Sequence, residues 1–460
     1  MNSHVSNMSF HLGGFCLVMN KYINFINLDF TCFSGACVTH VTSCMNKNIQ
    51  LSLRNSNFTT KPMKEKHQII IIGGGNAGLS VASQLLIKDH SLDIAIIDLA
   101  QKHYYQPAWT LVGGGTFDIK TTERNEKDVI PKGTTWIQQG VVSFQPDDNK
   151  ITLQDGSQLA YDTLIVAPGI QLNWDEVKGL RENLGKNGVC SNYSFETAPY
   201  TFEAIKNLKK GKAIFHNPHT PVKCGGAPHK IMYLAADYFR KHGVLKDIQI
   251  EYWSGGTRLF AVEKYEKTLL NVCKRGNINL NFFQKLVEIE GQNKRAKFVG
   301  FGENNKDVET WVEFDMIHVT PPQSAPNFIK ESALANAAGW VDVDKHTLQH
   351  VRYANIFSLG DASGLPTSKT GAAIRKQAPV CVSNVLSQLK GSPLKASYNG
   401  YTSCPLVTGY GKLVLAEFDY NNKPQETFPF DQSKERWSMF VLKKYVLPWL
   451  YWAKILPGKA

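Results

Sequence analysis

The sequence predicts an α/β protein with two tandem Rossmann-like domains and a C-terminal helical tail that associates with a membrane. Three observations support this fold class. A glycine-rich turn separates a β-branched run from a helical pattern near residue 73, further short apolar runs recur along the chain, and bulky aromatic residues alternate with lysines after residue 436. The length of 460 residues and the apolar content of 43% suffice for about three domains with buried cores.

The first element is a strand, a glycine turn and a helix, which together make a dinucleotide-binding fingerprint. A β-branched run ends at Ile72, and apolar residues recur at helical spacing after Gly78. Gly73 permits a tight turn, Gly75 lets the backbone approach a pyrophosphate, and Gly78 allows close packing of helix and strand. Asp98 ends the next apolar strand, where the partner of a ribose 2′-OH is expected.

Two later apolar strands end in turn residues, and here the chain resembles the glutathione-reductase-like flavoproteins with two dinucleotide-binding domains. One strand closes at Gly169 and the other at Asp361. The resemblance implies FAD, with Gly169 at the cofactor site and Asp361 on the ribityl chain; a plain turn cap is the alternative role of Asp361. Lys369 and Thr370 open a helix whose N-terminus is expected to face the flavin ring.

The second dinucleotide-like domain lacks the glycine fingerprint of a nicotinamide site. Its first strand is expected at residues 212–216 and another at 247–253. Between them stands Cys224-Gly-Gly-Ala-Pro-His229, which is not GxGxxG and which is flanked by Pro221. The domain is therefore expected to persist without nicotinamide binding, so that electrons enter at the flavin or at cysteines.

The closer resemblance is to the sulfide:quinone oxidoreductases, in the subgroup of the mitochondrial enzymes and their bacterial relatives. It covers about residues 66–456. The segments that carry it are His103–Val112, Pro221–Pro228, Lys230–Leu234, His318–Pro322, Ala338–Val343, Tyr401–Tyr410 and Glu426–Arg436.

By this resemblance, Cys224 and Cys404 are the redox pair. Hydrosulfide attacks the sulfur bridge between them, Cys404 carries the persulfide, and Cys224 faces the flavin as a thiolate. Sulfane sulfur leaves to sulfite, glutathione or another sulfide, and two electrons pass through FAD to ubiquinone or another quinone. FAD is expected to be non-covalent, since no cysteine lies between Cys44 and Cys190. No zinc spacing is present, and no metal is expected.

Other residues near the motifs are assigned plainer roles. Cys190, Cys273 and Cys381 are interpreted as buried packing residues. Lys223 could lower the pKa of the neighbouring thiol and His229 could carry protons, but a solvated or locally hydrogen-bonded role is favoured for both.

The net charge of +12 is spread along the chain without a nucleic-acid-binding motif, and a lipid-facing basic surface fits it better. Residues 437–456 mix tryptophan, tyrosine and lysine and are interrupted by Pro448, so no run spans a bilayer. One or two amphipathic helices in the membrane interface are expected, with packing on the body or dimerisation as the alternative. The protein is thus expected at a mitochondrial or bacterial inner membrane, as a peripheral protein and as a possible homo-oligomer.

The expected domain organisation splits the FAD domain along the chain. Residues 66–180 and 326–400 form it, residues 181–325 form the second dinucleotide-like domain, and residues 401–460 add the second cysteine and the membrane tail. Residues 1–65 are an extension that is either a transit peptide or an over-extended start before Met63.

Two alternative functions stay open at this point. A type II NADH:quinone dehydrogenase shares the scaffold and the membrane habit, but it requires a second GxGxxG. A non-catalytic flavin-bound interaction protein is the other, and its flavin would stay oxidised with sulfide and with NADH.

Overall fold

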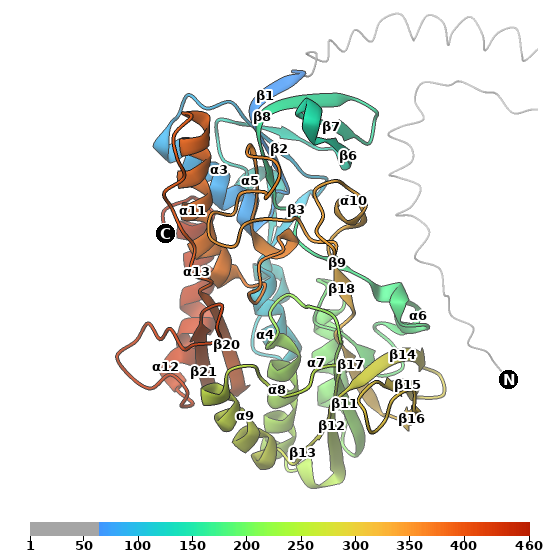
Figure 1. Cartoon of the computed structure of the whole chain (residues 1–460). Helices are drawn as coiled ribbons and strands as arrows, with labels where there is room; N and C mark the ends of the chain where they lie inside the picture. Colours follow the sequence, from blue (N-terminus) through green and yellow to red (C-terminus); the bar gives the residue numbers. More distant parts are fainter. Residues whose placement is uncertain (1–63) are drawn as a thin grey trace, which may run out of the picture. The chain divides into compact units, whose positions relative to one another are not determined.

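The computed structural model describes residues 64–460 (Figure 1). The interpretations of the N-terminal extension, together with its four cysteines, therefore lie outside the described residues. The described part forms one compact unit.

A seven-stranded sheet forms the first half of this unit. Its order is β5-β2-β1-β8-β7-β6, and β19 lies beside β8. The strands β5, β2, β1, β8 and β19 are parallel, whereas β7 is antiparallel to β8 and to β6. The strands are β1 (Lys66–Ile72), β2 (Ile94–Ile97), β5 (Thr134–Ile137), β6 (Val141–Gln145), β7 (Lys150–Leu153), β8 (Gln158–Val166) and β19 (Ile356–Ser358).

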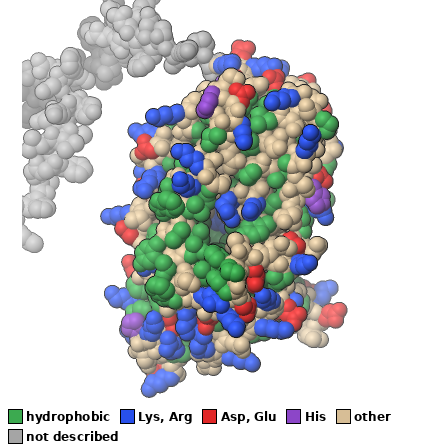
Figure 2. Space-filling model, turned by 90° about the vertical axis from the view of Figure 1, so that its left-hand side faces the viewer, with side chains coloured by type: hydrophobic (Ala, Val, Ile, Leu, Met, Phe, Trp, Pro, Cys, Tyr) green, Lys and Arg blue, Asp and Glu red, His purple; other side chains and the backbone are tan. Residues whose placement is uncertain are grey.

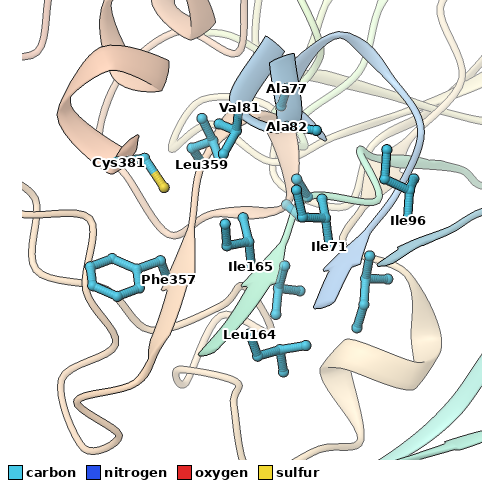
Figure 3. Close-up of a cluster of buried hydrophobic side chains, with 14 of the residues drawn as sticks. Ile71, Ala77, Val81, Ala82, Ile96, Leu164, Ile165, Phe357, Leu359 and Cys381 are labelled. Carbon is cyan, nitrogen blue, oxygen red and sulfur yellow. The ribbon is translucent and has the colours of Figure 1, made fainter. Parts of the chain in front are cut away.

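Two helices, α3 (Asn76–Lys88) and α11 (Gly371–Leu389), lie against each other beside this sheet. The sheet is buried on this side, so its central strands are continuous apolar runs. Figure 3 shows Ile71, Ile165 and Phe357 from three neighbouring strands in one cluster with Val81 and Cys381 from the two helices. Burying each large apolar side chain contributes roughly 1.5–3 kcal/mol, and this cluster is thus a main source of the stability of the sheet.

The second sheet has five parallel strands in the order β10-β17-β11-β12-β13. A separate antiparallel sheet has the order β14-β15-β16. The strands are β10 (Val189–Cys190), β11 (Gly211–Asn217), β12 (Ile248–Ser254), β13 (Ile278–Asn281), β14 (Gln284–Glu290), β15 (Arg295–Gly300), β16 (Glu309–Glu313) and β17 (Met316–Val319), and the helices are α7 (Ala198–Asn207), α8 (Ala227–Lys241) and α9 (Glu263–Arg275).

Short elements lie between the longer strands and helices of both halves. They are β3 (Lys102–Tyr104), α4 (Trp109–Gly113), β4 (Glu123–Asn125), α5 (Glu126–Val129), β9 (Gln171–Leu172), α6 (Leu180–Asn183), β18 (Gln323–Ser324) and α10 (Asn327–Lys330), with 3₁₀ turns at 106–108, 119–122, 146–148, 174–176, 245–247 and 360–362. The small ladders β3–β4 and β9–β18 are antiparallel.

The chain ends in a hairpin and a helical segment. The hairpin pairs β20 (Thr402–Gly409) with β21 (Lys412–Phe418). The helical segment then runs through α12 (Trp437–Val441), the π-helix η7 (Leu442–Val446), α13 (Leu447–Leu450) and the π-helix η8 (Tyr451–Ile455). Among residues 64–460, no helix combines the length and the apolar character needed to cross a membrane.

Candidate active site

Cys224 lies in the loop that leads from β11 into α8. Its φ of 53° is in the left-handed region, which is uncommon for a residue with a Cβ. Two backbone bonds hold it there: the Cys224 N–H donates to the Lys369 carbonyl at 2.8 Å, and its own carbonyl accepts from the Ala227 N–H at 2.7 Å. The loop is therefore bonded directly to the residues that precede α11.

Cys404 reaches the same point from the C-terminal hairpin. It lies on β20 opposite Ala416 of β21, and its side chain is buried. The Sγ atoms of Cys224 and Cys404 are 3.5 Å apart. Tertiary structure thus brings together two cysteines that lie far apart in the sequence.

Gly226 makes this approach of the two cysteines possible. A Cβ at this position would lie 2.6 Å from Cys404 Sγ and would overlap the Leu406 side chain. Gly226 is therefore needed for the hairpin to pack on this loop.

Lys230 contacts the cysteine pair from the first turns of α8. Its side chain is buried, and Nζ donates to Cys224 Sγ at 3.0 Å. The hydrogen bond from Cys404 and the charge of Lys230 hold the pKa of Cys224 well below its ordinary 9.0, against the effect of burial. The hydrogen bond to Cys224 and burial instead raise the pKa of Cys404 well above 9.0. The pair is therefore unequal, and Cys224 is its thiolate member.

A second buried lysine comes from the C-terminal segment. Lys443 donates to the Pro107 carbonyl at 2.9 Å, and burial lowers its pKa to about 7, with Lys230 adding to the effect and the two cysteines opposing it. In the sequence, Lys443 is only one of the lysines mixed into residues 437–456.

The two residues considered beside Cys224 both hydrogen-bond other side chains. Lys223 turns away from the sulfur, and its Nζ donates to Gln106 Oε1 at 2.6 Å. His229 is buried with Nε2 2.7 Å from the Tyr252 hydroxyl, and burial, aided by Lys230, lowers its pKa to about 3. Lys230 was not predicted from the sequence as a site residue, although a lysine directly before the apolar run Ile231–Ala236 was a usable signal.

The glycine turn after β1 has the geometry of a nucleotide cradle. Gly73 has a φ of 102°, and a Cβ there would overlap the backbone of Ala167. A Cβ on Gly78 would overlap the Gly73 carbonyl, so α3 packs directly on the turn. Gly75 instead has no atom within 4 Å of an added Cβ, and Gly169 is equally open. These open positions fit a bound dinucleotide.

Asp98 stands at the end of β2 and holds this turn. Its Oδ2 accepts from the Gly74 N–H at 2.5 Å, and its Oδ1 accepts from the Ala100 N–H at 2.7 Å. Both oxygens thus bond backbone amides, and each keeps a further lone pair for a hydroxyl.

Asp361, Lys369 and Thr370 lie where α11 begins. Lys369 Nζ donates to the carbonyls of Asp361 and Ser363 at 2.8 and 3.0 Å, and Thr370 accepts from the Ala373 N–H at 3.1 Å as the helix cap. Burial raises the pKa of Asp361, and Lys369 and Lys223 oppose it. Since Lys369 also bonds the Cys224 backbone, this group and the cysteine pair form one site.

The remaining described cysteines are packing residues. Cys190, Cys273 and Cys381 are buried, and burial raises their pKa values to about 12, 11 and 12. Within residues 64–460, no three His, Cys, Asp or Glu side chains group as metal ligands would.

A family model defines the class of protein to which this fold and site belong. Residues 67–382 match the model described as pyridine nucleotide-disulphide oxidoreductase. This match covers more than half of the chain, and the protein is therefore an FAD-dependent oxidoreductase of this class.

More similar relatives narrow the class. The chain is 50% identical over 417 residues to the mitochondrial sulfide:quinone oxidoreductase of Dictyostelium discoideum, which covers 90% of this chain and 91% of that protein. It is 42% identical over 396 residues to the mitochondrial enzyme of the same name from Mus musculus, covering 86% and 87%. The chain belongs to the sulfide:quinone oxidoreductase family, as the sequence motifs predicted.

A solved structure agrees in fold. The X-ray structure of the sulfide:quinone oxidoreductase from Aquifex aeolicus superposes with a TM-score of 0.73 at 19% identity, over 85% of this chain and 92% of that chain. The predicted fold class is thereby confirmed.

Proposed function

We propose that this protein oxidises sulfide at the Cys224–Cys404 pair and passes two electrons through FAD to a membrane quinone. The observation that carries the assignment of the pair is the 3.5 Å approach of the two Sγ atoms, with Lys230 Nζ 3.0 Å from Cys224. The assignment of sulfide as substrate, quinone as electron acceptor and FAD as cofactor follows from membership of the family.

The inequality of the two sulfurs sets the direction of attack. Hydrosulfide attacks Cys404 Sγ in the oxidised, disulfide-bonded pair, the bond between the two sulfurs breaks, and Cys224 leaves as a thiolate. The thiol with the lower pKa is the better leaving group, and Lys230 stabilises the charge that forms on it. Cys404 is then the persulfide carrier.

The outer sulfur leaves in a second displacement. A nucleophile such as sulfite, glutathione or another sulfide attacks it, which returns Cys404 as a thiolate. Re-forming the bond between the two sulfurs releases two electrons, and FAD supplies the acceptor for this pair and the route to quinone. With sulfite, the net change is hydrosulfide, sulfite, quinone and one proton going to thiosulfate and quinol.

We further propose that two groups of residues bind FAD, one at each end of the cofactor. The nucleotide half is bound by Gly73, Gly75, Gly78 and Asp98. The flavin half is bound by Gly169, Asp361, Lys369 and Thr370. The open faces of Gly75 and Gly169, and the bonds from the start of α11 to the Cys224 loop, support this division. The FAD domain then comprises residues 66–180 and 326–400, because β19 completes the first sheet beside β8.

Anaerobic titration tests the function directly. Sulfide is expected to bleach the 450 nm absorbance band of the flavin in the holoenzyme within the time of one turnover. A soluble quinone analogue is then expected to restore this band. NADH at equal concentration is expected to leave the band unchanged, because the loop at Cys224 replaces a nicotinamide fingerprint. Rapid bleaching by NADH and none by sulfide would overturn the proposal.

We also propose that the protein is a peripheral protein of the mitochondrial inner membrane that binds through the helical segment 437–455. One face of this segment packs on the body through Met439, Phe440 and Tyr451. The opposite face exposes Trp437, Tyr445 and Trp449, with exposed fractions of 70%, 60% and 57%. Figure 2 shows apolar side chains gathered on the side of the molecule that carries α12 and α13, with Lys and Arg around them. Exposed tryptophan and tyrosine beside lysine suit a lipid interface.

Binding to lipid vesicles tests whether this exposed face contacts a membrane. Replacing Tyr445 and Trp449 together with alanine is expected to weaken binding to vesicles of phosphatidylcholine and cardiolipin by about ten-fold or more, since two large apolar contacts are lost. Sedimentation with the vesicles gives the bound fraction. Trp311→Ala removes another exposed tryptophan, on β16, and serves as the matched control. Equal binding of all three proteins would show that this face does not contact lipid.

A further inference from the structure

Three buried polar side chains connect the C-terminal segment to the glycine turn. Tyr451 of η8 has its hydroxyl 2.7 Å from His103 Nε2, and His103 Nδ1 is 3.2 Å from Glu126 Oε2. All three are buried. A neutral His103 that donates from Nδ1 to the carboxylate accepts at Nε2 from the tyrosine hydroxyl, so the contacts form one consistent chain. We call Tyr451, His103 and Glu126 the tail relay.

The far end of the tail relay lies against the nucleotide turn. A Cβ on Gly74 would lie 2.7 Å from Glu126 Oε1 and 3.2 Å from Asp98 Oδ2, so both carboxylates converge on this one glycine. Glu126 Oε1 has no hydrogen-bond partner among the described residues. Among residues 64–460, the Glu126 carboxylate makes a single hydrogen bond, the one between Oε2 and His103.

Local structure explains how Glu126 comes to this place. His103 lies on β3 and Glu126 directly follows β4, and these two short strands pair in an antiparallel ladder. The Glu126 N–H also donates to the Gln101 carbonyl at 2.9 Å. Burial raises the pKa of Glu126, Asp98 adds to this, and His103 opposes it. His103 is thus the side chain that favours the ionised form of Glu126.

The end of the C-terminal segment contacts α3, the helix that follows the same turn. Ser83 of α3 donates to the Leu456 carbonyl at 2.6 Å, and Ser80 donates to the Ile455 carbonyl at 3.3 Å. Gly458 has a φ of 73°, and a Cβ on it would lie 2.9 Å from the Gln84 nitrogen. The C-terminal segment therefore touches the fingerprint helix as well as the tail relay.

We propose that the tail relay makes FAD retention depend on the docked C-terminal segment: Tyr451 orients His103, His103 holds Glu126, and Glu126 braces the glycine turn that binds the pyrophosphate. These three are positioning residues. The proposal rests on FAD binding by the fingerprint and is independent of the chemistry at the cysteines. Any event that displaces the segment at Tyr451 then loosens the cofactor.

The test uses the full-length holoenzyme and measures the FAD dissociation constant from flavin fluorescence during removal and readdition of FAD. Tyr451→Phe removes one hydroxyl and is expected to raise this constant about ten-fold, as loss of one buried hydrogen bond to a charged network would. Glu126→Gln is expected to have a similar effect. The double variant is expected to match the more severe single variant, because both changes break the same chain.

Matched controls separate this role from a general loss of stability. Tyr445→Phe alters an exposed tyrosine on the same segment, and Glu123→Gln alters the carboxylate that pairs with Lys102 on the same hairpin. Both are expected to leave the FAD dissociation constant unchanged. The melting temperature of the holoenzyme is expected to fall more in Tyr451→Phe than that of the apoprotein, because only the holoenzyme also loses FAD affinity.

Clear results would overturn the proposal. An unchanged FAD dissociation constant in Tyr451→Phe, or equal destabilisation of apoprotein and holoenzyme, would reduce the relay to ordinary packing. Effects of Tyr451→Phe and Glu126→Gln that multiply in the double variant would show that they act separately. Should Tyr451→Phe fail to fold, Ser83→Ala weakens the same docked segment, and an unchanged FAD affinity in that variant also contradicts the proposal.

Discussion

Replacing Cys404 or Cys224 with serine is expected to slow bleaching of the flavin by sulfide at least about a thousand-fold. A serine hydroxyl forms neither a disulfide nor a persulfide, and its pKa is far too high for it to act as a leaving group at neutral pH. Because the two sulfurs lie 3.5 Å apart and react with each other, either replacement alone removes the partner of the remaining cysteine and abolishes the disulfide. Anaerobic stopped-flow absorbance at 450 nm measures the rate.

Cys381→Ser is the matched control for this experiment. Cys381 is buried in the apolar cluster of the first sheet (Figure 3), whereas Cys224 and Cys404 pack in a different cluster, and burial raises the pKa of Cys381 to about 12. Its replacement is expected to lower stability somewhat but to leave the bleaching rate within a few-fold of the unaltered enzyme. A Cys224→Ser or Cys404→Ser enzyme that reacts as fast as Cys381→Ser would show that sulfide meets the flavin directly.

Lys230→Met is expected to raise the pKa of Cys224. Methionine keeps the unbranched shape but removes the charge whose Nζ lies 3.0 Å from the sulfur, and burial then favours the neutral thiol. The direction of the change in rate follows because the thiolate is the reactive form of Cys224. Reactivity falls as the pH drops through the pKa, so a higher pKa moves the loss to higher pH, and at pH 7 the rate falls at least about ten-fold.

Alkylation of the reduced enzyme by iodoacetamide reports this pKa directly. The modification of Cys224 is followed by mass spectrometry between pH 5 and pH 10. Lys223→Met is a stringent control, because Lys223 is the sequence neighbour of Cys224 but bonds Gln106 instead. Lys230→Arg is expected to restore most of the thiolate. Matching pH profiles for Lys230→Met and Lys223→Met would refute the assigned role of Lys230.

The parts of the site that the sequence predicted are those set by short stretches of chain. The strand, turn and helix around Gly73, Gly75 and Gly78 follow from β-branched residues and from glycines at fixed spacing, and the structure forms them as expected. Thr370 as the start of α11 is of the same kind, because a capping residue acts within its own helical turn. Such features need no knowledge of distant residues.

The electrostatics of the site were harder to predict, because they depend on side-chain direction. Lys223 and Lys230 are both close to Cys224 in sequence, yet only Lys230 points its Nζ at the sulfur. The helical turn of α8 carries Lys230 back towards the cysteine, whereas the extended loop carries Lys223 away from it. Lys443 is a similar case, since the docked segment turns it inward while Tyr445 stays exposed.

By itself, the sequence determined the family and predicted the cofactor-binding fingerprint and the pair Cys224 and Cys404, because these depend on local patterns of residue type and spacing. Only the tertiary structure decided that Cys224 and Cys404 lie 3.5 Å apart, that Lys230 makes them unequal, and that Tyr451 reaches the glycine turn through His103 and Glu126. These contacts join strands, loops and a terminal segment that are distant in the chain. The physical reason is that packing of whole elements, rather than the preference of any single segment, brings such groups within bonding distance.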